Sequence, residues 1–212
     1  MSDYNMKLLV GALLQGDQEL AVSETKKLMN DGVSVDRIIA DGVEFSMVQL
    51  DDKCTVEQFN LLEIMLVGRA SMAVMKEIYP PGSNPPFTKG TVVIGSLEGD
   101  IHDLGKGIVK MVLTAKGYKV VDCGKDCPVE KMINTARKEK AHTIAISGLI
   151  TTVIPSVKKI KDRLKVLGMS DIMVIAGGAA LKQASVSELN VDFVGDTAFD
   201  AGHYLDQYEW LK

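Results

Sequence analysis

Five short runs rich in β-branched and other apolar residues follow residue 90, and helical patterns separate them. Strands that are apolar on both faces and alternate with helices are typical of a parallel sheet covered by helices on both sides. We therefore predict an α/β domain over residues 91–212, with a doubly wound five-stranded parallel sheet in the flavodoxin-like order. The predicted strands are TVVIGS, YKVVDC, HTIAIS, DIMVIAG and VDFVG, and the predicted helices begin near Leu104, Val129, Thr152, Ala179 and Thr197.

A helical pattern fills the residues before this domain. Apolar residues recur there at helical spacing, as at Leu9 and Leu13, which predicts a small bundle of four helices over residues 1–78. Residues 79–90, YPPGSNPPFTKG, hold four of the six prolines of the chain. Prolines exclude helix and favour an extended connector, so we predict an interdomain linker at 79–90.

The composition is that of a globular chain and limits the possible partners. Lys plus Arg is 24 and Asp plus Glu is 28, a net charge of −4, so no basic field exists to gather nucleic acid or anionic lipid. We find neither a secretory cleavage signal nor an apolar stretch that could span a bilayer. The three cysteines suit a reducing compartment, and the spacing of Cys123 and Cys127 predicts ordinary loop thiols. We expect a cytoplasmic protein without membrane or nucleic-acid partners.

The segment EGDIHDLGKG follows the first predicted strand, at the sheet edge where ligands bind in doubly wound folds. It differs from a phosphate-binding P-loop because five residues separate Gly99 from Gly105 and because Gly107 replaces the magnesium-binding hydroxyl. A phosphate site built from backbone amides stays possible, although it gives no role to His102. A hydrolase built on Asp100 and His102 lacks an assignable nucleophile.

The position of His102 favours a metal ligand. Asp103 is a plausible N-cap for the helix that follows, which places His102 in the loop and over the crevice. The carboxylate of Asp100 could accept the Nδ1 proton and leave Nε2 basic for a metal. His142 and His203 lack this context.

Small residues follow the other strands at the same predicted edge. Ser147 ends the third strand, Gly177 and Gly178 end the fourth, and Gly195 ends the fifth. They would let a ligand run close to the backbone. Gly105 weakens the helix after the opening loop, which indicates that something bulky needs that space.

Three motifs at this edge resemble the signatures of cobalamin-binding domains. They are D-x-H-x-x-G at Asp100, His102 and Gly105, S-x-L at Ser147 and Leu149, and G-G at Gly177 and Gly178. The helical part before the linker is similar to the cap domain that precedes this fold in methionine synthase and in corrinoid proteins of anaerobic methyltransferase systems. The resemblance covers nearly the whole chain.

The resemblance implies a cobalamin bound base-off and His-on. His102 would be the lower axial ligand of cobalt and Asp100 would tune it, while the nucleotide tail of the cofactor would enter the crevice between the loops. The resemblance gives this set of cofactor-binding residues: Asp100, His102, Asp103, Gly105, Ser147, Leu149, Thr151, Gly177 and Gly178.

Two departures from the family pattern concern the proton relay and the cap. The position that holds a relay serine in methionine synthase is Val153 here, so a relay beyond Asp100 is not expected to follow the family pattern. The Pro-Glu pair of the family cap is Leu62-Glu63 here, and Met65 and Leu66 are candidates to cover the cobalt.

The function that the resemblance implies is a methyl carrier without catalytic residues beyond its cofactor. Its partners would be a substrate-specific methyltransferase, a second methyltransferase to tetrahydrofolate or a thiol, and a reductive activase. Methoxylated aromatics, methylamines and methanol are possible methyl sources, with a preference for an O-demethylase. The alternatives are a cobalamin-responsive regulator, although residues 1–78 are not notably basic, and a phosphate- or nucleotide-binding module without corrinoid.

Overall fold

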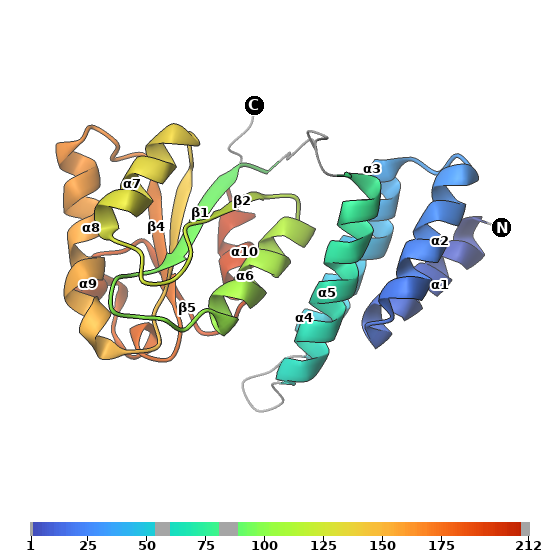
Figure 1. Ribbon diagram of the computed structural model, residues 1–212, viewed down its shortest axis with the longest axis horizontal. Helices are drawn as coiled ribbons and strands as arrows, with labels where there is room; N and C mark the ends of the chain where they lie inside the picture. Colours follow the sequence, from blue (N-terminus) through green and yellow to red (C-terminus); the bar gives the residue numbers. More distant parts are fainter. Residues whose placement is uncertain (1, 54–59, 81–88, 209–212) are drawn as a thin grey trace. The chain divides into compact units, whose positions relative to one another are not determined.

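The computed structural model describes residues 2–53, 60–80 and 89–208 of the chain. The chain divides into two compact units, a helical unit and a second unit that holds the sheet (Figure 1). Residues 81–88, which make up most of the predicted linker, lie outside the described residues, so that linker stays a prediction.

The first unit is made of helices, as the helical spacing of its apolar residues predicted. Its elements are α1 (Ser2–Gln15), α2 (Gln18–Asn30), α3 (Val35–Ile38), the π-helical segment η1 (Ile39–Glu44), α4 (Phe45–Lys53) and α5 (Leu61–Ile78). Because α3, η1 and α4 follow one another without a break, the described residues of this unit form four helical stretches. Asp17 and Asn60 begin α2 and α5 as N-caps, each accepting a backbone N–H three residues further on.

The core of the helical unit is apolar except for a few polar side chains. Leu9, Leu13 and Leu28 are fully buried in it. Glu24 is buried as well, and its Oε1 accepts a hydrogen bond of 2.6 Å from Lys27 Nζ. Its other oxygen, Oε2, has no hydrogen-bond partner among the described residues. The helical unit therefore holds a buried carboxylate that is only half satisfied.

The second unit confirms the predicted sheet. Its elements are β1 (Thr91–Ser96), α6 (Leu104–Ala115), β2 (Lys119–Asp122), α7 (Val129–Lys138), β3 (Thr143–Ser147), η2 (Thr151–Val153), α8 (Ile154–Val166), β4 (Met173–Gly177), η3 (Leu181–Gln183), α9 (Val186–Leu189), β5 (Phe193–Gly195) and α10 (Asp200–Leu205). The strands are parallel in the order β2-β1-β3-β4-β5, which is the flavodoxin-like order. Ser96 pairs with Ser147 and Ser147 with Gly177, so the carboxyl ends of β1, β3 and β4 are level.

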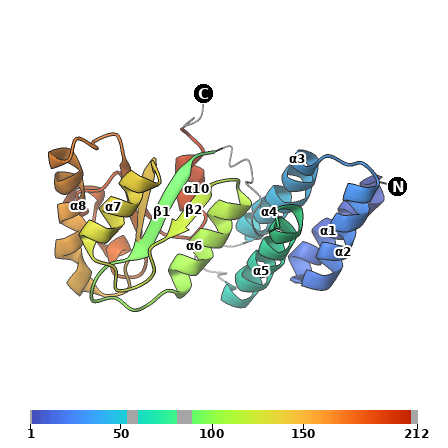
Figure 2. The ribbon, with the colours of Figure 1, turned by 45° about the horizontal axis from the view of Figure 1, so that its top comes forward.

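Helices cover both faces of this sheet because alternate side chains of each strand point to opposite sides. Val93 packs in a cluster with apolar residues of α7 and α8, whereas Val92 and Ile94 pack with residues of α6 and α10. Figure 2 shows the same arrangement, with α7 and α8 on one side of β1 and α6 and α10 on the other. Because both faces of such a strand are buried, its sequence is a continuous apolar run.

The structure corrects the predicted helix that begins near Ala179. A 3₁₀ turn, η3, and the four-residue α9 replace it. A capping box of Ser185 and Glu188 begins α9, and Asn190 ends it with a left-handed backbone. The last helix, α10, begins at Asp200 rather than at the predicted Thr197.

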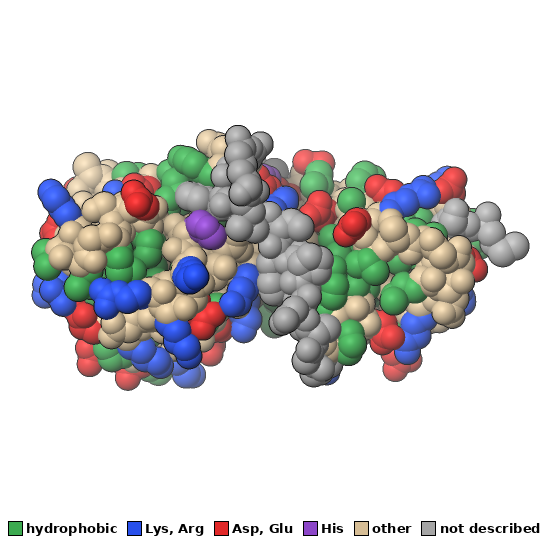
Figure 3. Space-filling view, turned by 90° about the horizontal axis from the view of Figure 1, so that it is seen from above, with side chains coloured by type: hydrophobic (Ala, Val, Ile, Leu, Met, Phe, Trp, Pro, Cys, Tyr) green, Lys and Arg blue, Asp and Glu red, His purple; other side chains and the backbone are tan. Residues whose placement is uncertain are grey.

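The described surface carries both signs of charge. On the face shown in Figure 3, lysine and arginine side chains lie among aspartates and glutamates. None of the helices in the described ranges has the length and apolar character needed to cross a membrane.

Candidate functional site

The site is built around Asp100, which lies in the loop after β1 and is fully buried. Its Oδ1 accepts the His102 backbone N–H at 3.0 Å and lies 2.7 Å from His102 Nδ1. Its Oδ2 accepts the Leu149 backbone N–H at 2.7 Å. Both carboxylate oxygens are therefore satisfied, and the loop after β1 is joined to the loop after β3.

These contacts keep Asp100 ionised. Burial alone would raise the pKa of this carboxyl, but the N–H groups of His102 and Leu149 and the His102 ring together hold it below the usual value. An ionised carboxylate can only accept a hydrogen bond, so the neutral ring of His102 carries its hydrogen on Nδ1 and donates it to Asp100. The lone pair on Nε2 is then available to a metal.

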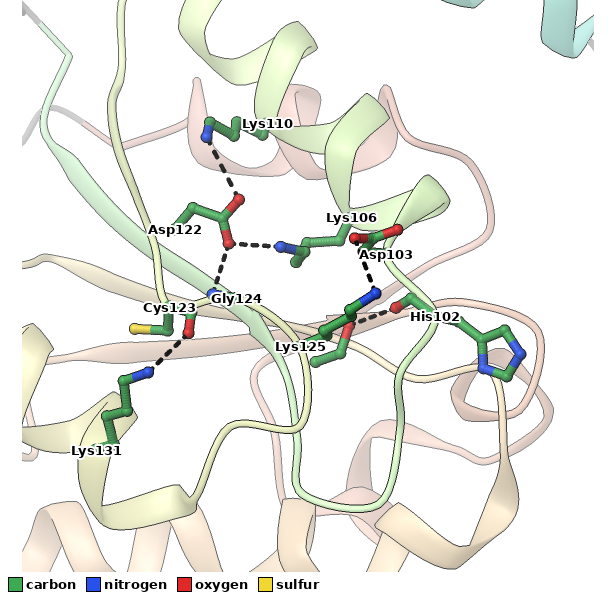
Figure 4. A network of polar contacts seen from close by, with 10 residues as sticks. His102, Asp103, Lys106, Lys110, Asp122, Cys123, Gly124, Lys125 and Lys131 are labelled. Carbon is green, nitrogen blue, oxygen red and sulfur yellow. Dashed lines mark hydrogen bonds and ion pairs between the residues drawn. The ribbon is translucent and has the colours of Figure 1, made fainter.

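His102 presents this nitrogen outward. Its side chain is 52% exposed, in contrast to the buried carboxylate behind it. In Figure 4 the ring points away from the other labelled side chains. Its backbone oxygen accepts a hydrogen bond of 2.8 Å from Ser96 Oγ, a buried hydroxyl at the end of β1. His102 is thus held in place through its backbone oxygen and through Nδ1 of its ring.

The loop after β2 supports the same segment from behind. Asp126 donates its backbone N–H to the Asp100 oxygen at 3.0 Å, and its side chain accepts the Gly99 N–H at 2.8 Å. Cys127 donates its N–H to the oxygen of Ser96. The sequence interpretation missed Asp126 and Ser96, because their contacts join a side chain to a backbone group of another residue, and a backbone partner leaves no residue-specific pattern.

An ion pair fixes the first turn of α6 (Figure 4). The Lys106 side chain is almost completely buried, and its Nζ lies 2.6 Å from Asp122 at the end of β2. Burial raises the pKa of Asp122, but hydrogen bonds from Lys106 and the Gly124 N–H outweigh it, so the pKa lies below the usual value. The pair joins α6 to the sheet beside His102.

Open space and apolar surface surround the exposed ring. A Cβ on Gly105 would lie 4.0 Å from Ser147 Oγ, so the absent side chain leaves room between α6 and the end of β3. Three apolar side chains in the loops after β1 and β3 and at the start of α6 are well exposed. They are Ile101 at 64%, Leu104 at 49% and Leu149 at 47%. The surface around His102 thus offers one nitrogen ligand within an apolar rim.

Backbone packing explains why glycines stand at positions 177 and 178. Gly178 has a φ of +100°, and a Cβ there would lie 2.6 Å from the oxygen of Gly148. Gly148 in turn donates its N–H to the Gly177 oxygen at 2.9 Å. These glycines let the loops after β3 and β4 pack against each other, and that packing shapes the edge beside Ser147.

The remaining predicted residues lie at or near this edge. Asp103 precedes α6, its backbone oxygen accepts the Gly107 N–H, and its carboxylate lies 3.9 Å from Lys125 Nζ. Thr151 is exposed in η2. Val153 is buried and has no polar side-chain atom, so it cannot extend a proton relay.

His142 and His203 lie away from the site. His142 Nδ1 accepts the Thr91 N–H at the opposite end of β1, and His203 lies in α10. In the helical unit, Leu66 lies against the turn at Gly16, where a Cβ would come within 2.5 Å of Leu66 Cβ. The assignment of Met65 and Leu66 over cobalt stays a prediction.

Comparison with known proteins identifies the family of the chain. Residues 90–202, more than half of the chain, match the family described as the B12 binding domain. The trimethylamine corrinoid protein 1 of Methanosarcina acetivorans is 31% identical over 89% of both chains. This chain belongs to the corrinoid proteins of methyltransferase systems.

Two further relatives agree with this membership. The methanol–corrinoid protein of Methanosarcina barkeri is 31% identical over 92% of this chain and 75% of its own length. The crystal structure of the methanol:cobalamin methyltransferase complex from the same organism contains a chain that superposes with a TM-score of 0.81 at 29% identity, over 98% of this corrinoid protein and 81% of that chain.

The residues of this corrinoid protein fit its cofactor. Within the described ranges, no group of three or more His, Cys, Asp and Glu side chains could hold a metal ion. A cobalt held by His102 alone would have to take its other ligands from the corrinoid. The match to the B12 binding domain and the corrinoid relatives confirm the cofactor prediction. The exposed apolar side chains and the space beside Gly105 are compatible with a large macrocycle with a tail.

Proposed function

We propose that this corrinoid protein carries a methyl group from a substrate-specific methyltransferase to a second methyltransferase. The observation that supports it most is the Asp100–His102 pair, a fully buried carboxylate that orients a half-exposed imidazole in a corrinoid-family fold. When bound, the corrinoid supplies a cobalt centre that accepts and releases methyl groups.

The chain's own contribution is to hold one nitrogen ligand and to adjust its basicity. Asp100 fixes the tautomer of His102 and orients the ring, as carboxylates behind metal-binding histidines do. Because Leu149 and His102 donate two backbone N–H groups to the same carboxylate, the pair is pre-organised before the cofactor binds. We propose that His102 would hold the cobalt of the corrinoid through Nε2 and that Asp100 positions the His102 ring.

We assign the space between α6 and the end of β3 to the nucleotide tail of the cofactor. Gly105 leaves the entrance open, and Ser147 provides a hydroxyl at 4.0 Å from the Cβ position of Gly105. Thr151 and the edge formed by Gly177 and Gly178 would line the same path. Asp103 and Leu149 complete the proposed set at the mouth of the site.

The names of relatives point to the class of methyl donor. They are corrinoid proteins of trimethylamine, dimethylamine and methanol. We therefore propose a methylated amine or methanol as the first donors to test. The O-demethylase preference from the sequence stays a prediction, as do the tetrahydrofolate or thiol acceptor and the reductive activase.

A pair of glycine variants tests the proposed tail path. Gly105→Ala and Gly107→Ala both lie in the first turns of α6, and each should stabilise the cofactor-free protein by up to about 1 kcal/mol. We expect Gly105→Ala alone to weaken retention of hydroxocobalamin, because Gly107 has no neighbouring atom within 4 Å of its Cβ position and is not assigned to the path. Equal retention by both variants would remove Gly105 from the proposal.

A methyl-transfer assay tests the function itself. Reconstituted protein is mixed with the methyltransferases encoded beside it, a reductant and, in turn, trimethylamine, methanol or a methoxylated aromatic compound. We expect demethylation of one donor class only when this protein is present. Corrinoid binding without demethylation of any donor, together with retarded mobility of its own promoter DNA, would instead support the regulator.

A further inference from the structure

The loop after β2, residues 123–127, lies against the segment that carries His102. The backbone pairing of β1 and β2 continues past both strands. Ser96 donates its N–H to the Gly124 oxygen at 3.1 Å and accepts the Cys127 N–H at 2.9 Å. The Cys127 oxygen in turn accepts the Glu98 N–H at 3.0 Å. Every residue except proline can make such backbone bonds, so they do not explain which side chains this loop needs.

Asp126 adds a side-chain contact at the turn that precedes His102. The turn runs from Leu97 to Asp100, whose N–H donates to the Leu97 oxygen at 2.9 Å, and Gly99 has a φ of +93° at its third position. That position of a tight turn favours glycine, and the turn's own hydrogen bond does not use the Gly99 N–H. Asp126 Oδ1 accepts this N–H at 2.8 Å, and its backbone N–H donates to the Asp100 oxygen at 3.0 Å. Asp126 therefore holds the turn on both sides of one peptide unit.

The segment around His102 is fixed at both ends by the same part of the chain. After His102, the Lys106 ammonium lies 2.6 Å from the Asp122 carboxylate, which also accepts the Gly124 N–H at 2.9 Å (Figure 4). Before His102, the contacts of Asp126 hold the turn. The end of β2 and its loop thus hold the segment on the two sides of the histidine, and Asp126 supplies the hold nearest to Asp100.

We infer that Asp126 is a positioning residue for the Asp100–His102 pair. Its hydrogen bond to Gly99 fixes the turn, and the turn sets the direction of the next side chain, that of Asp100. Without this bond the Asp100 carboxylate would separate more often from the Leu149 N–H and from His102, and the corrinoid would be retained less well. The effect on the corrinoid rests on the proposed function, whereas the effect on Asp100 concerns the cofactor-free chain alone.

The backbone of Asp126 determines which variants test this role. Its φ is +52°, in the left-handed region that glycine and asparagine adopt readily. Asp126→Gly removes the acceptor of the Gly99 N–H, whereas Asp126→Asn keeps a side-chain oxygen at the same place. Lys140→Gly is the matched control, because Lys140 is an exposed residue with a φ of +50° that lies shortly after α7, at the opposite edge of the sheet.

The first measurement is amide hydrogen exchange of the full cofactor-free chain, followed by NMR. The reporters are the His102 and Leu149 N–H groups, which donate to the Asp100 carboxylate. The Asp192 N–H, which donates to the Val174 oxygen at 2.7 Å, is the reference for a change in global stability.

We expect Asp126→Gly to speed exchange at both reporters by about tenfold, the size of one net hydrogen bond, and to leave the reference unchanged. Asp126→Asn and Lys140→Gly should exchange like the wild type. Unchanged reporters in Asp126→Gly, an equal acceleration at the reference, or the same acceleration in Asp126→Asn would overturn the inference.

Retention of hydroxocobalamin and its visible spectrum are then compared among the same proteins. We expect Asp126→Gly to retain the corrinoid about tenfold less tightly and with a smaller His-on fraction, the size seen when support behind a metal ligand is weakened. Asp126→Asn and Lys140→Gly should match the wild type. Wild-type retention by Asp126→Gly despite faster exchange would overturn the link to the cofactor. Failure of the wild type to bind corrinoid would instead contradict the proposed function and leave the exchange result standing.

Discussion

Asp100 and Glu24 are both buried carboxylates, yet their surroundings differ. Asp100 receives hydrogen bonds on both oxygens, two of them from backbone N–H groups that cannot move away. Glu24 receives one hydrogen bond, from a lysine whose side chain is 56% exposed, and its other oxygen has no partner among the described residues. The first carboxylate is built into the sheet unit, whereas the second depends on one flexible side chain.

This difference in hydrogen bonding makes Asp100 part of a pre-organised site, whereas Glu24 is a buried polar group that the fold tolerates. A buried carboxylate with fixed donors gains more from its hydrogen bonds than it loses by desolvation, and it can then orient a ligand. A half-satisfied carboxylate is destabilised by desolvation and gains little from hydrogen bonding in compensation. We therefore expect substitutions at the two positions to change stability in opposite directions.

Asp100→Ala should have the largest effect. It leaves the buried N–H groups of His102 and Leu149 without acceptors, and we expect the free energy of unfolding to fall by about 3 kcal/mol. Retention of hydroxocobalamin should fall by about 10- to 100-fold. Urea unfolding and spectrophotometric titration measure the two quantities.

An exposed aspartate of the same unit is the matched control for that substitution. Asp171→Ala should change the free energy of unfolding by less than about 0.5 kcal/mol. If Asp100→Ala were as mild as the control, the buried hydrogen bonds would not support the loop in the way that we describe.

Lys27→Met should have the next largest effect, because it removes the one hydrogen bond that Glu24 receives. Methionine matches the lysine side chain without its terminal ammonium group, so the variant removes mainly the charge and the hydrogen bond. We expect a loss of about 2 kcal/mol in the free energy of unfolding, less than for a fully buried pair because the lysine is partly exposed. Adding Glu24→Leu should restore most of the loss, and a double-mutant cycle with no coupling would contradict the pairing.

Glu24→Leu by itself should stabilise the protein by up to about 1 kcal/mol, since an apolar group of similar size replaces a half-satisfied carboxylate. The same thermal or urea unfolding measurement shows the sign. A marked loss of stability would mean that Oε2 has a partner, such as a bound water, that makes Glu24 resemble Asp100.

The smallest expected effect is the pH dependence of Asp100. Its pKa is lower in the folded protein than the value of about 4 in an unfolded chain, so its stabilisation is complete above that value and is lost as the pH falls through the folded-state pKa. The stability difference between the wild type and Asp100→Asn should therefore narrow from neutral pH to about pH 3. Urea unfolding at each pH measures it, and a difference that widens in acid would have the wrong sign.

The sheet and the central pair of the site were predictable from the sequence for local reasons. Apolar runs bury both faces of a parallel strand, and Asp100 and His102 are close enough in the chain that their contact needs only a tight loop. The capping box of Ser185 and Glu188 was a readable signal for α9 that the prediction of a helix near Ala179 overlooked.

The rest of the site depended on contacts between distant segments. The sequence indicated Leu149 as a side chain that lines the crevice, but its backbone N–H makes the contact with Asp100. Asp126 supports Gly99 from 27 residues away. Backbone donors carry no residue-specific pattern, so only the folded chain reveals them.

The central claim is that His102, held by Asp100, offers its Nε2 to the cobalt of a corrinoid. The most direct measurement is the visible spectrum of purified protein after reconstitution with hydroxocobalamin and removal of excess, for wild type, His102→Ala and, as a control, His203→Ala in α10. The account predicts a retained corrinoid with a base-off, His-on spectrum in the wild type and in His203→Ala, and a changed spectrum or lost retention in His102→Ala. A spectrum of His102→Ala identical to that of the wild type would contradict it.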